Sequence, residues 1–323
     1  AVGSQYFRYY DVRQATAITS SGQFVIRYIE TKVNEYINNI FKTKSDYIVA
    51  SDTDSIYLCL DKLVQETCKD KTNEQITDFL NKVVEQKIEP FIEKCFEDLA
   101  DYTNAFRQRM VMKREVIADK GIWTAKKRYM LHVLDEEGFR YEEPKMKIMG
   151  IEAVKSSTPE VCRGKIKEAI DIVMTKDNDD LITFVKDFKK EFNSMTPEQI
   201  SFPRSCNNLA KYRSSSQIFI KGTPIHVKGA LIYNHQIKKF KITNKYPTIQ
   251  EGDKIKFIKL KEINPFKFDV ISYMTKLPRE FELEKYIDRE VQFQKTFITP
   301  LNFILEAIGW DYEKKASLEA FFG

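Results

Sequence analysis

The chain has 323 residues, of which 42% are hydrophobic and 31% charged, and its formal net charge is +5. This length suggests two domains with a sizeable core, and the composition excludes an intrinsically disordered protein. No apolar run approaches the roughly 18 residues of a membrane span, so we expect no membrane partner. The five cysteines are odd in number and form no C-x-x-C pair. This argues against a zinc site or a disulfide framework and indicates a reducing compartment.

The spacing of apolar residues predicts an α+β first domain over residues 1–150. A long helix is expected over 14–40, where apolar residues recur every three or four positions. The next expected elements are a hairpin over 46–61, a helical stretch over 73–103 that is kinked or broken at Pro90, strands over 110–118 and 123–135, and a turn at 136–138 that leads into 139–141. These strands predict an antiparallel sheet packed with helices.

A domain boundary is expected near Gly150, where composition and charge both change. The second domain, residues 151–323, is predicted to be mixed. We expect helices over 159–175, 179–193 and 280–309, and mostly β structure over 216–260.

Positive charge is concentrated in this second part. Residues 1–150 hold 23 basic and 24 acidic residues, whereas 204–267 alone hold 14 basic and three acidic residues. Such a segment is typical of a surface that binds a polyanion, because each neutralised phosphate releases condensed counterions. A solvated lysine-rich face would have the same composition, and charge alone does not decide between the two.

Asp52 and Asp54 stand two residues apart at the tip of the predicted hairpin. Phosphoryl transfer with two magnesium ions needs carboxylates on a rigid support, and the flanking strands 47–50 and 56–60 would provide one. A spacing of two returns a side chain to the same side of a strand. Asp, Ser and Thr are also common turn formers, so the spacing alone leaves an ordinary turn open.

Three cations, Lys126, Lys127 and Arg128, stand between Trp123 and Tyr129 on a predicted strand. Alternation would place Lys127 and Tyr129 on one face and Lys126 and Arg128 on the other. Cations bind phosphates or minor-groove acceptors, and a tyrosine can pack against a sugar. The alternative is a charged strand edge that prevents aggregation.

The string 51–57 resembles the D-T-D-S motif of family B DNA polymerases, which lies on a hairpin of their palm domain. Ser51 stands where the family usually has glycine. The resemblance implies that Asp54 is the essential metal ligand and that Asp52 assists. It also implies two Mg²⁺ ions, shared with another palm aspartate.

The string 123–129 resembles the K-K-x-Y element of the same family. This implies that Lys126, Lys127, Arg128 and Tyr129 contact the primer strand. Further strings resemble the T-even-type phage replicative polymerases in order along the chain: 7–11, 15–19, 32–36, 147–152, 156–159, 207–212, 264–266 and 312–318. They imply a partial palm over 1–150 and a thumb over 151–323 that grips duplex DNA, and Lys211 and Tyr212 are expected to bind DNA.

The last seven residues, 317–323, hold three large apolar side chains. Leu318, Phe321 and Phe322 have i, i+3, i+4 spacing and would form one face of a helical turn. Such a face suits a hydrophobic pocket on a partner or on the chain's own core. The resemblance implies that this tail binds the sliding clamp.

Two family motifs are not in the sequence: the D-x-x-S-L-Y-P-S-like palm motif with the second aspartate, and the fingers motif K-x-x-x-N-S-x-Y-G. Residues 1–4 resemble those that directly follow the fingers motif. We therefore expect the exonuclease, the fingers and the second aspartate in an N-terminal portion, which is either a complementary chain of a split polymerase or the rest of a longer chain. Without it, we expect negligible incorporation.

The resemblance thus implies the C-terminal portion of a replicative DNA polymerase. Such an enzyme binds primer–template DNA and a dNTP and adds dNMP to a primer 3′-hydroxyl, here in the cytoplasm of a phage-infected bacterium. A non-catalytic DNA-binding or clamp-binding remnant would explain the basic segment and the tail equally well, although the retained D-T-D hairpin favours the enzyme. Another nucleotidyltransferase is disfavoured by the thumb resemblance, and a P-loop ATPase by the lack of G-x-x-x-x-G-K-[ST].

Overall fold

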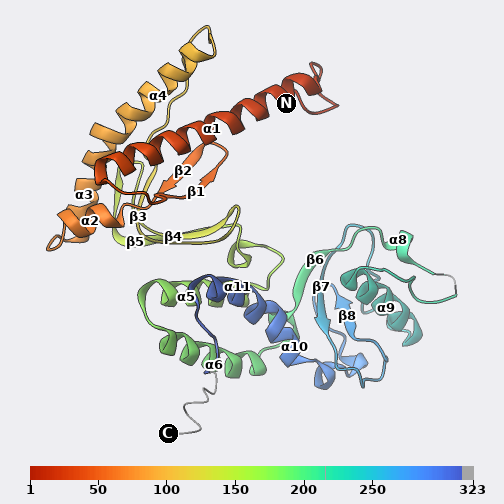
Figure 1. Cartoon of the computed structure of the whole chain (residues 1–323). Coiled ribbons are helices and arrows are strands. Elements are labelled where there is room, and N and C mark those ends of the chain that lie inside the picture. The colour runs from red at the N-terminus through yellow and green to blue at the C-terminus, as the bar shows by residue number, and fades with distance from the viewer. Residues whose placement is uncertain (215, 315–323) are drawn as a thin grey trace. The chain divides into compact units, whose positions relative to one another are not determined.

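The computed structural model describes residues 1–214 and 216–314. It divides into two compact units, Ala1–Lys147 and Ile148–Gly323. In the described residues the strands form small sheets of order β1-β2, β3-β4-β5 and β6-β7-β8 among many helices (Figure 1). The predicted α+β class is therefore confirmed. The assignment of residues 1–150 to a palm and 151–323 to a thumb stays a prediction.

The elements of the first unit follow the predicted order in most places. They are α1 (Val12–Phe41), β1 (Ile48–Asp52), β2 (Ser55–Leu58), α2 (Asp61–Thr67), α3 (Asn73–Val83), a π turn (Val84–Ile88), α4 (Glu89–Tyr102), β3 (Val116–Ala125), β4 (Arg128–Glu136) and β5 (Phe139–Met149). The long helix, the hairpin and the turn at 137–138 are confirmed.

The core of the first unit supports the β1–β2 hairpin. Ile29, Val33 and Ile37 recur at four-residue spacing on α1 and are buried against α4. Because these positions lie on one face of a helix, α1 presents a continuous apolar stripe. Ile48 of β1 belongs to the same buried cluster, and α1 lies against the hairpin (Figure 1). The strand that leads to the paired aspartates is therefore anchored in the core.

The expected distortion at Pro90 is confirmed, and its form is a π turn. Pro90 is the second residue of α4, directly after the π turn Val84–Ile88. Proline has no N–H to donate, and its ring crowds the carbonyl four residues earlier. The wider π turn before Pro90 relieves this crowding, so the helix continues. Pro300 repeats the arrangement after the π turn Gln294–Ile298.

The strand predicted over 110–118 is wrong in its first half, since β3 begins at Val116. The preceding backbone groups are bound by side chains instead of a neighbouring strand. The Gln108 side chain binds both N–H and C=O of Met110, and Glu89 Oε1 accepts from the Arg114 N–H at 2.9 Å. With these groups satisfied locally, the segment does not need to join the sheet.

The second unit combines a helical layer with the β6-β7-β8 sheet. Its elements are α5 (Glu160–Thr175), α6 (Asn178–Ser194), α7 (Pro197–Ile200), β6 (Phe202–Ser205), α8 (Leu209–Tyr212), α9 (Ile225–Lys239), β7 (Lys254–Lys259), β8 (Val270–Tyr273), α10 (Arg289–Phe293), a π turn (Gln294–Ile298) and α11 (Thr299–Ile308), with 3₁₀ turns at Glu152–Val154, Arg279–Phe281 and Glu284–Tyr286. The helices expected over 159–175 and 179–193 are confirmed.

Two predictions for this unit need correction. The stretch 216–260 is not mostly β: its longest element is α9, and β7 is its strand. Val227, Ala230, Tyr233 and Ile237 are buried on α9, and their three- and four-residue spacing favours a helix despite the β-branched residues among them. The helix expected over 280–309 is continuous only from Arg289, after two separate 3₁₀ turns.

Gly229 lets α9 approach β8 closely. A Cβ atom at this position would lie 2.8 Å from the Ser272 amide nitrogen and 3.0 Å from the Ile271 carbonyl carbon. We expect Gly229→Ala to lower the free energy of unfolding by about 1–3 kcal/mol, because backbone atoms cannot move aside as a side chain does. The measurement is the midpoint of urea unfolding.

Gly164→Ala is the matched control. Gly164 lies on the exposed side of α5, with nothing within 4 Å of an added Cβ. Alanine at this position is expected to stabilise by up to about 1 kcal/mol through helix propensity. Equal effects of the two substitutions would contradict the close approach of α9 to β8.

Candidate functional site

The paired aspartates lie at the tip of the β1–β2 hairpin, as the sequence predicts. Asp52 ends β1 and pairs in register with Ser55, so Thr53 and Asp54 form the connection. Thr53 has a φ of 53°, and its hydroxyl donates to Asp52 Oδ1 at 3.0 Å. The Ser55 hydroxyl donates to the Asp52 carbonyl oxygen at 3.1 Å. The tip is thus fixed by its own side chains, with Asp54 exposed and Asp52 half-buried.

Asp52 is held in its ionised form. The Thr53 hydrogen bond lowers the pKa of its carboxyl, burial opposes this, and Lys127 lowers the pKa further. The Lys127 Nζ lies 3.3 Å from Asp52 Oδ1. This ion pair brings the basic-aromatic string to the aspartate hairpin, although the two are separated by about 70 residues in the sequence.

The predicted placement of the cations on alternating strand faces is wrong. β3 ends at Ala125, which pairs with Arg128 at the start of β4, so Lys126 and Lys127 form the turn between the two strands. Lys127 adopts a φ of 61°. A left-handed lysine is uncommon, and neither glycine nor asparagine marks the turn in the sequence. Both lysines are consequently exposed at the end of a hairpin.

Three aromatic rings join this second hairpin to the first. Tyr57 of β2 lies 5.3 Å from Trp123 of β3 and 5.4 Å from Tyr129 of β4, measured between ring centroids. The Tyr57 hydroxyl donates to the Tyr129 hydroxyl at 3.0 Å. Burial, and then the hydrogen bond to Tyr129, raise the pKa of Tyr57 to about 12. No role was predicted from the sequence for Tyr57 or Trp123 themselves, although both lie within the motif strings.

Two further contacts, also missed from the sequence, anchor β1 to α1. The Ser51 hydroxyl donates to Glu30 Oε2 at 3.1 Å, and Asn34 Oδ1 accepts from the Tyr47 amide at 2.9 Å. Their partners are 21 and 13 residues away, so no local sequence signal marks them.

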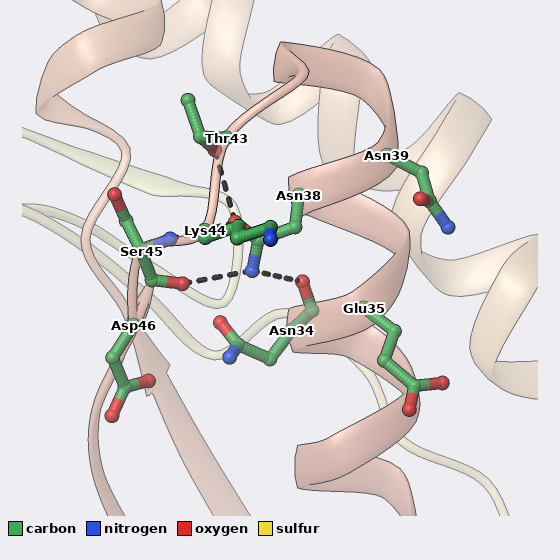
Figure 2. A pocket seen from close by; sticks show the side chains of 8 residues that line it. All are labelled: Asn34, Glu35, Asn38, Asn39, Thr43, Lys44, Ser45 and Asp46. Atoms are coloured by element: carbon green, nitrogen blue, oxygen red, sulfur yellow. Dashed lines mark hydrogen bonds between the residues drawn. The ribbon is translucent and has the colours of Figure 1, made fainter.

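A polar hollow lies where α1 ends. Figure 2 shows the Asn38 amide between helix and loop, donating to the Asn34 carbonyl at 3.0 Å and the Ser45 carbonyl at 2.8 Å. Thr43 donates to Asn38 Oδ1 at 3.0 Å. These amides are thus used to shape the loop that leads into β1.

In the second unit the basic segment is partly neutralised. Lys228 and Lys259 bind the Asp269 carboxylate at 2.7 and 2.8 Å, and burial opposes but does not prevent a lowering of its pKa to about 2. Lys245 binds Glu280. These three lysines are therefore committed to ion pairs within the unit.

Lys211 and Tyr212, the two DNA-binding candidates of this unit, lie on the short helix α8. Glu251 accepts from the Leu209 N–H at 2.8 Å and so holds the start of this helix. The Lys211 ammonium lies 5.5 Å from the centre of the Tyr212 ring. The pair thus offers a cation and an aromatic ring together.

Some expected features are not tested by the structure. The tail candidates Leu318, Phe321 and Phe322 lie outside the described residues. Within residues 1–214 and 216–314, no three His, Cys, Asp or Glu side chains converge into a metal-binding group. In the same residues, no helix is both long and apolar enough to cross a membrane.

Comparison with known proteins adds a relationship over the whole chain. No family model matches the sequence. The chain is 37% identical, over its entire length, to a DNA-directed DNA polymerase of Enterobacteria phage T4. Over 98% of its length it is 40% identical to a DNA-directed DNA polymerase of Escherichia phage RB69. Over nearly its whole length the chain is thus similar to T4-like family B DNA polymerases. It spans 37% and 36% of the length of these two polymerases.

Proposed function

We propose that this chain is the palm-and-thumb portion of a phage replicative DNA polymerase. The observation that carries the proposal is the meeting of two hairpins, in which the D-T-D tip lies beside the Lys126–Lys127 turn through the ion pair of Asp52 with Lys127. The alignment over the full chain supports it. The proposed reaction is template-directed attack of a primer 3′-hydroxyl on a dNTP. It needs the N-terminal portion, with a second palm aspartate, as the rest of a longer chain or as a complementary chain.

The aspartate tip suits magnesium by its donor chemistry. Mg²⁺ is held in polymerase sites by one or two carboxylates together with substrate phosphates and water, and Asp54 and Asp52 offer two carboxylates on a rigid turn. Asp54 is the proposed ligand and Asp52 its assistant. Two Mg²⁺ ions would supply charge stabilisation for the attacking and leaving oxygens.

The chain's own residues position the duplex in this proposal. Lys126 and Lys127 present their ammonium groups to primer phosphates from the exposed turn, with Arg128 and Tyr129 on the strand behind them. Lys211 and Tyr212 add a contact from the second unit. The proposed cellular site is the cytoplasm of the infected bacterium, and the tail with Leu318, Phe321 and Phe322 is the proposed contact with a sliding clamp.

Binding of primer–template DNA by the chain tests this proposal. We expect Lys126→Ala and Lys127→Ala each to weaken binding and to reduce the salt dependence, measured as the slope of log K against log [salt], by about 1. Lys69→Ala is the matched control, because Lys69 is an exposed lysine in a turn of the same unit. A chain that does not bind duplex DNA, or equal slopes in all three variants, would refute the proposed role.

A further inference from the structure

Trp123 contacts both other aromatic residues of the site, Tyr57 and Tyr129. It packs edge-on against Tyr57 at 5.3 Å, with 67° between the ring planes, and stacks with Tyr129 at 6.1 Å and 28°. Trp123 and Tyr129 are also direct cross-strand partners in the β3–β4 ladder. The Lys126–Lys127 turn begins three residues after Trp123 and ends two residues before Tyr129.

The backbone leaves space for this ring. A Cβ atom at Gly121 would lie 2.6 Å and 2.8 Å from two carbons of the Trp123 six-membered ring and 2.9 Å from Leu131 Cδ2. Residues two apart on a strand lie on the same face, so the indole lies back over Gly121. Any side chain at 121 would displace the ring.

The indole is held by ring contacts and not by a hydrogen bond. Its Nε1 is buried, and no residue within 1–214 or 216–314 accepts a hydrogen bond from it. Buried tryptophan N–H groups usually donate a hydrogen bond. Because Nε1 of Trp123 donates none, replacing the indole with the phenyl ring of phenylalanine removes no hydrogen bond from the fold. What Trp123 contributes is the shape and position of its ring.

We propose that Trp123 is a positioning residue: through Tyr57 and Tyr129 it holds the Lys126–Lys127 turn against the aspartate hairpin, so that the Lys127 cation stays beside Asp52. Trp123 itself touches neither Asp52 nor the proposed DNA. The effect of Trp123 on primer binding rests on the proposed function. Its effect on the position of the Lys126–Lys127 turn does not.

The rigidity of the Lys126–Lys127 turn tests the proposal in the full chain. NMR order parameters of the Lys126 and Lys127 backbone amides report how firmly this turn is held. We expect Trp123→Ala to lower these order parameters and to leave those of Glu137 and Gly138, in the turn at the other end of β4, unchanged. Trp123→Phe should retain most of the wild-type order, because a ring remains.

Gly121→Ala provides an independent variant that leaves Trp123 in the sequence. It should displace the indole and lower the order parameters of the Lys126 and Lys127 amides as Trp123→Ala does, whereas Gly22→Ala, with open space around an added Cβ, should have no effect. If Trp123→Ala and Gly121→Ala lower the unfolding temperature but leave the order parameters of this turn unchanged, Trp123 is a core residue only and the proposal fails.

Primer–template binding separates this inference from the proposed function. If both hold, Trp123→Ala and Lys127→Met reduce the salt slope by the same amount, about 1, and are not additive. If Lys127→Met weakens binding and Trp123→Ala does not, the positioning role is refuted. If Lys127→Met leaves binding intact, the proposed DNA contact fails, while the order parameters of the Lys126–Lys127 turn still decide the role of Trp123.

Discussion

In the proposed polymerase, Asp54→Asn is expected to slow nucleotide incorporation about a thousandfold and to leave binding of primer–template DNA unchanged. Asn has nearly the size of Asp but no charge, and Asp54 is exposed at the hairpin tip, so the fold should not change. A loss of several kcal/mol of charge stabilisation in the transition state corresponds to this factor. An effect on rate without one on binding would place Asp54 in the chemical step.

The enzyme for this measurement is a chimera in which the chain replaces the aligned 36% of the phage RB69 polymerase. Primer extension gives the rate, and a gel-shift titration gives the affinity. Asp70→Asn is the matched control, since Asp70 is an exposed turn aspartate of the same unit. If the Asp54→Asn chimera extends primers at the parental rate, the result would favour the non-catalytic DNA-binding remnant over the enzyme.

Asp52→Asn is expected to have a different signature. It removes the negative charge that pairs with Lys127 and leaves one acceptor oxygen in place of two, so it weakens the contacts of the turn as well as changing the charge. We therefore expect it to change DNA affinity together with rate. The comparison separates a metal ligand from a residue that also orders the site.

The parts of the fold that the sequence predicts are those set by local pattern. α1 follows from apolar residues every three or four positions, and the β1–β2 hairpin from two apolar runs around a polar turn. The motif strings around Asp54 and Lys127 are likewise contiguous. Local information was enough to find the β1–β2 hairpin, but it predicted one strand over 123–135 where the structure has the turn of a second hairpin.

What the sequence does not predict depends on side-chain contacts with the backbone, on a turn without the usual turn residues, and on partners far along the chain. Residues 110–115 have strand composition, but Glu89 and Gln108 satisfy part of their backbone. The Lys126–Lys127 turn has none of the usual turn residues. The contact of Tyr57 with Tyr129 joins residues 72 apart, which no periodicity can reveal.

Replacing Asp135 with asparagine is expected to lower the free energy of unfolding by about 3 kcal/mol. The Asp135 side chain is only 4% exposed and pairs with Arg114, whose side chain is 11% exposed. It also accepts from the Gly138 amide at 3.0 Å and from Arg140 Nε at 3.3 Å. Removing one partner of a buried ion pair leaves the other charge uncompensated, which costs more than the pair itself contributes.

The pH dependence of unfolding tests the contribution of the Asp135 charge. Burial raises the pKa of Asp135, but the Arg114 and Gly138 hydrogen bonds outweigh it, so the pKa lies below 3.8 in the folded protein. A lowered folded pKa gives stability that is complete above the unfolded value and is lost as the pH falls through the folded one. The difference between wild type and Asp135→Asn should therefore be full at neutral pH and shrink below about pH 4.

Glu136→Gln is the neighbouring control. Glu136 binds Lys147 at 2.8 Å and Lys145 at 3.2 Å, and these hydrogen bonds, with that of Tyr141, lower its pKa to about 2. Its lysine partners remain in contact with solvent, so its loss should cost less than about 1 kcal/mol. Asp135 and Glu136 are adjacent on β4 and differ in burial. If Asp135→Asn and Glu136→Gln lower the free energy of unfolding equally in thermal unfolding, burial does not govern the strength of the Asp135–Arg114 pair.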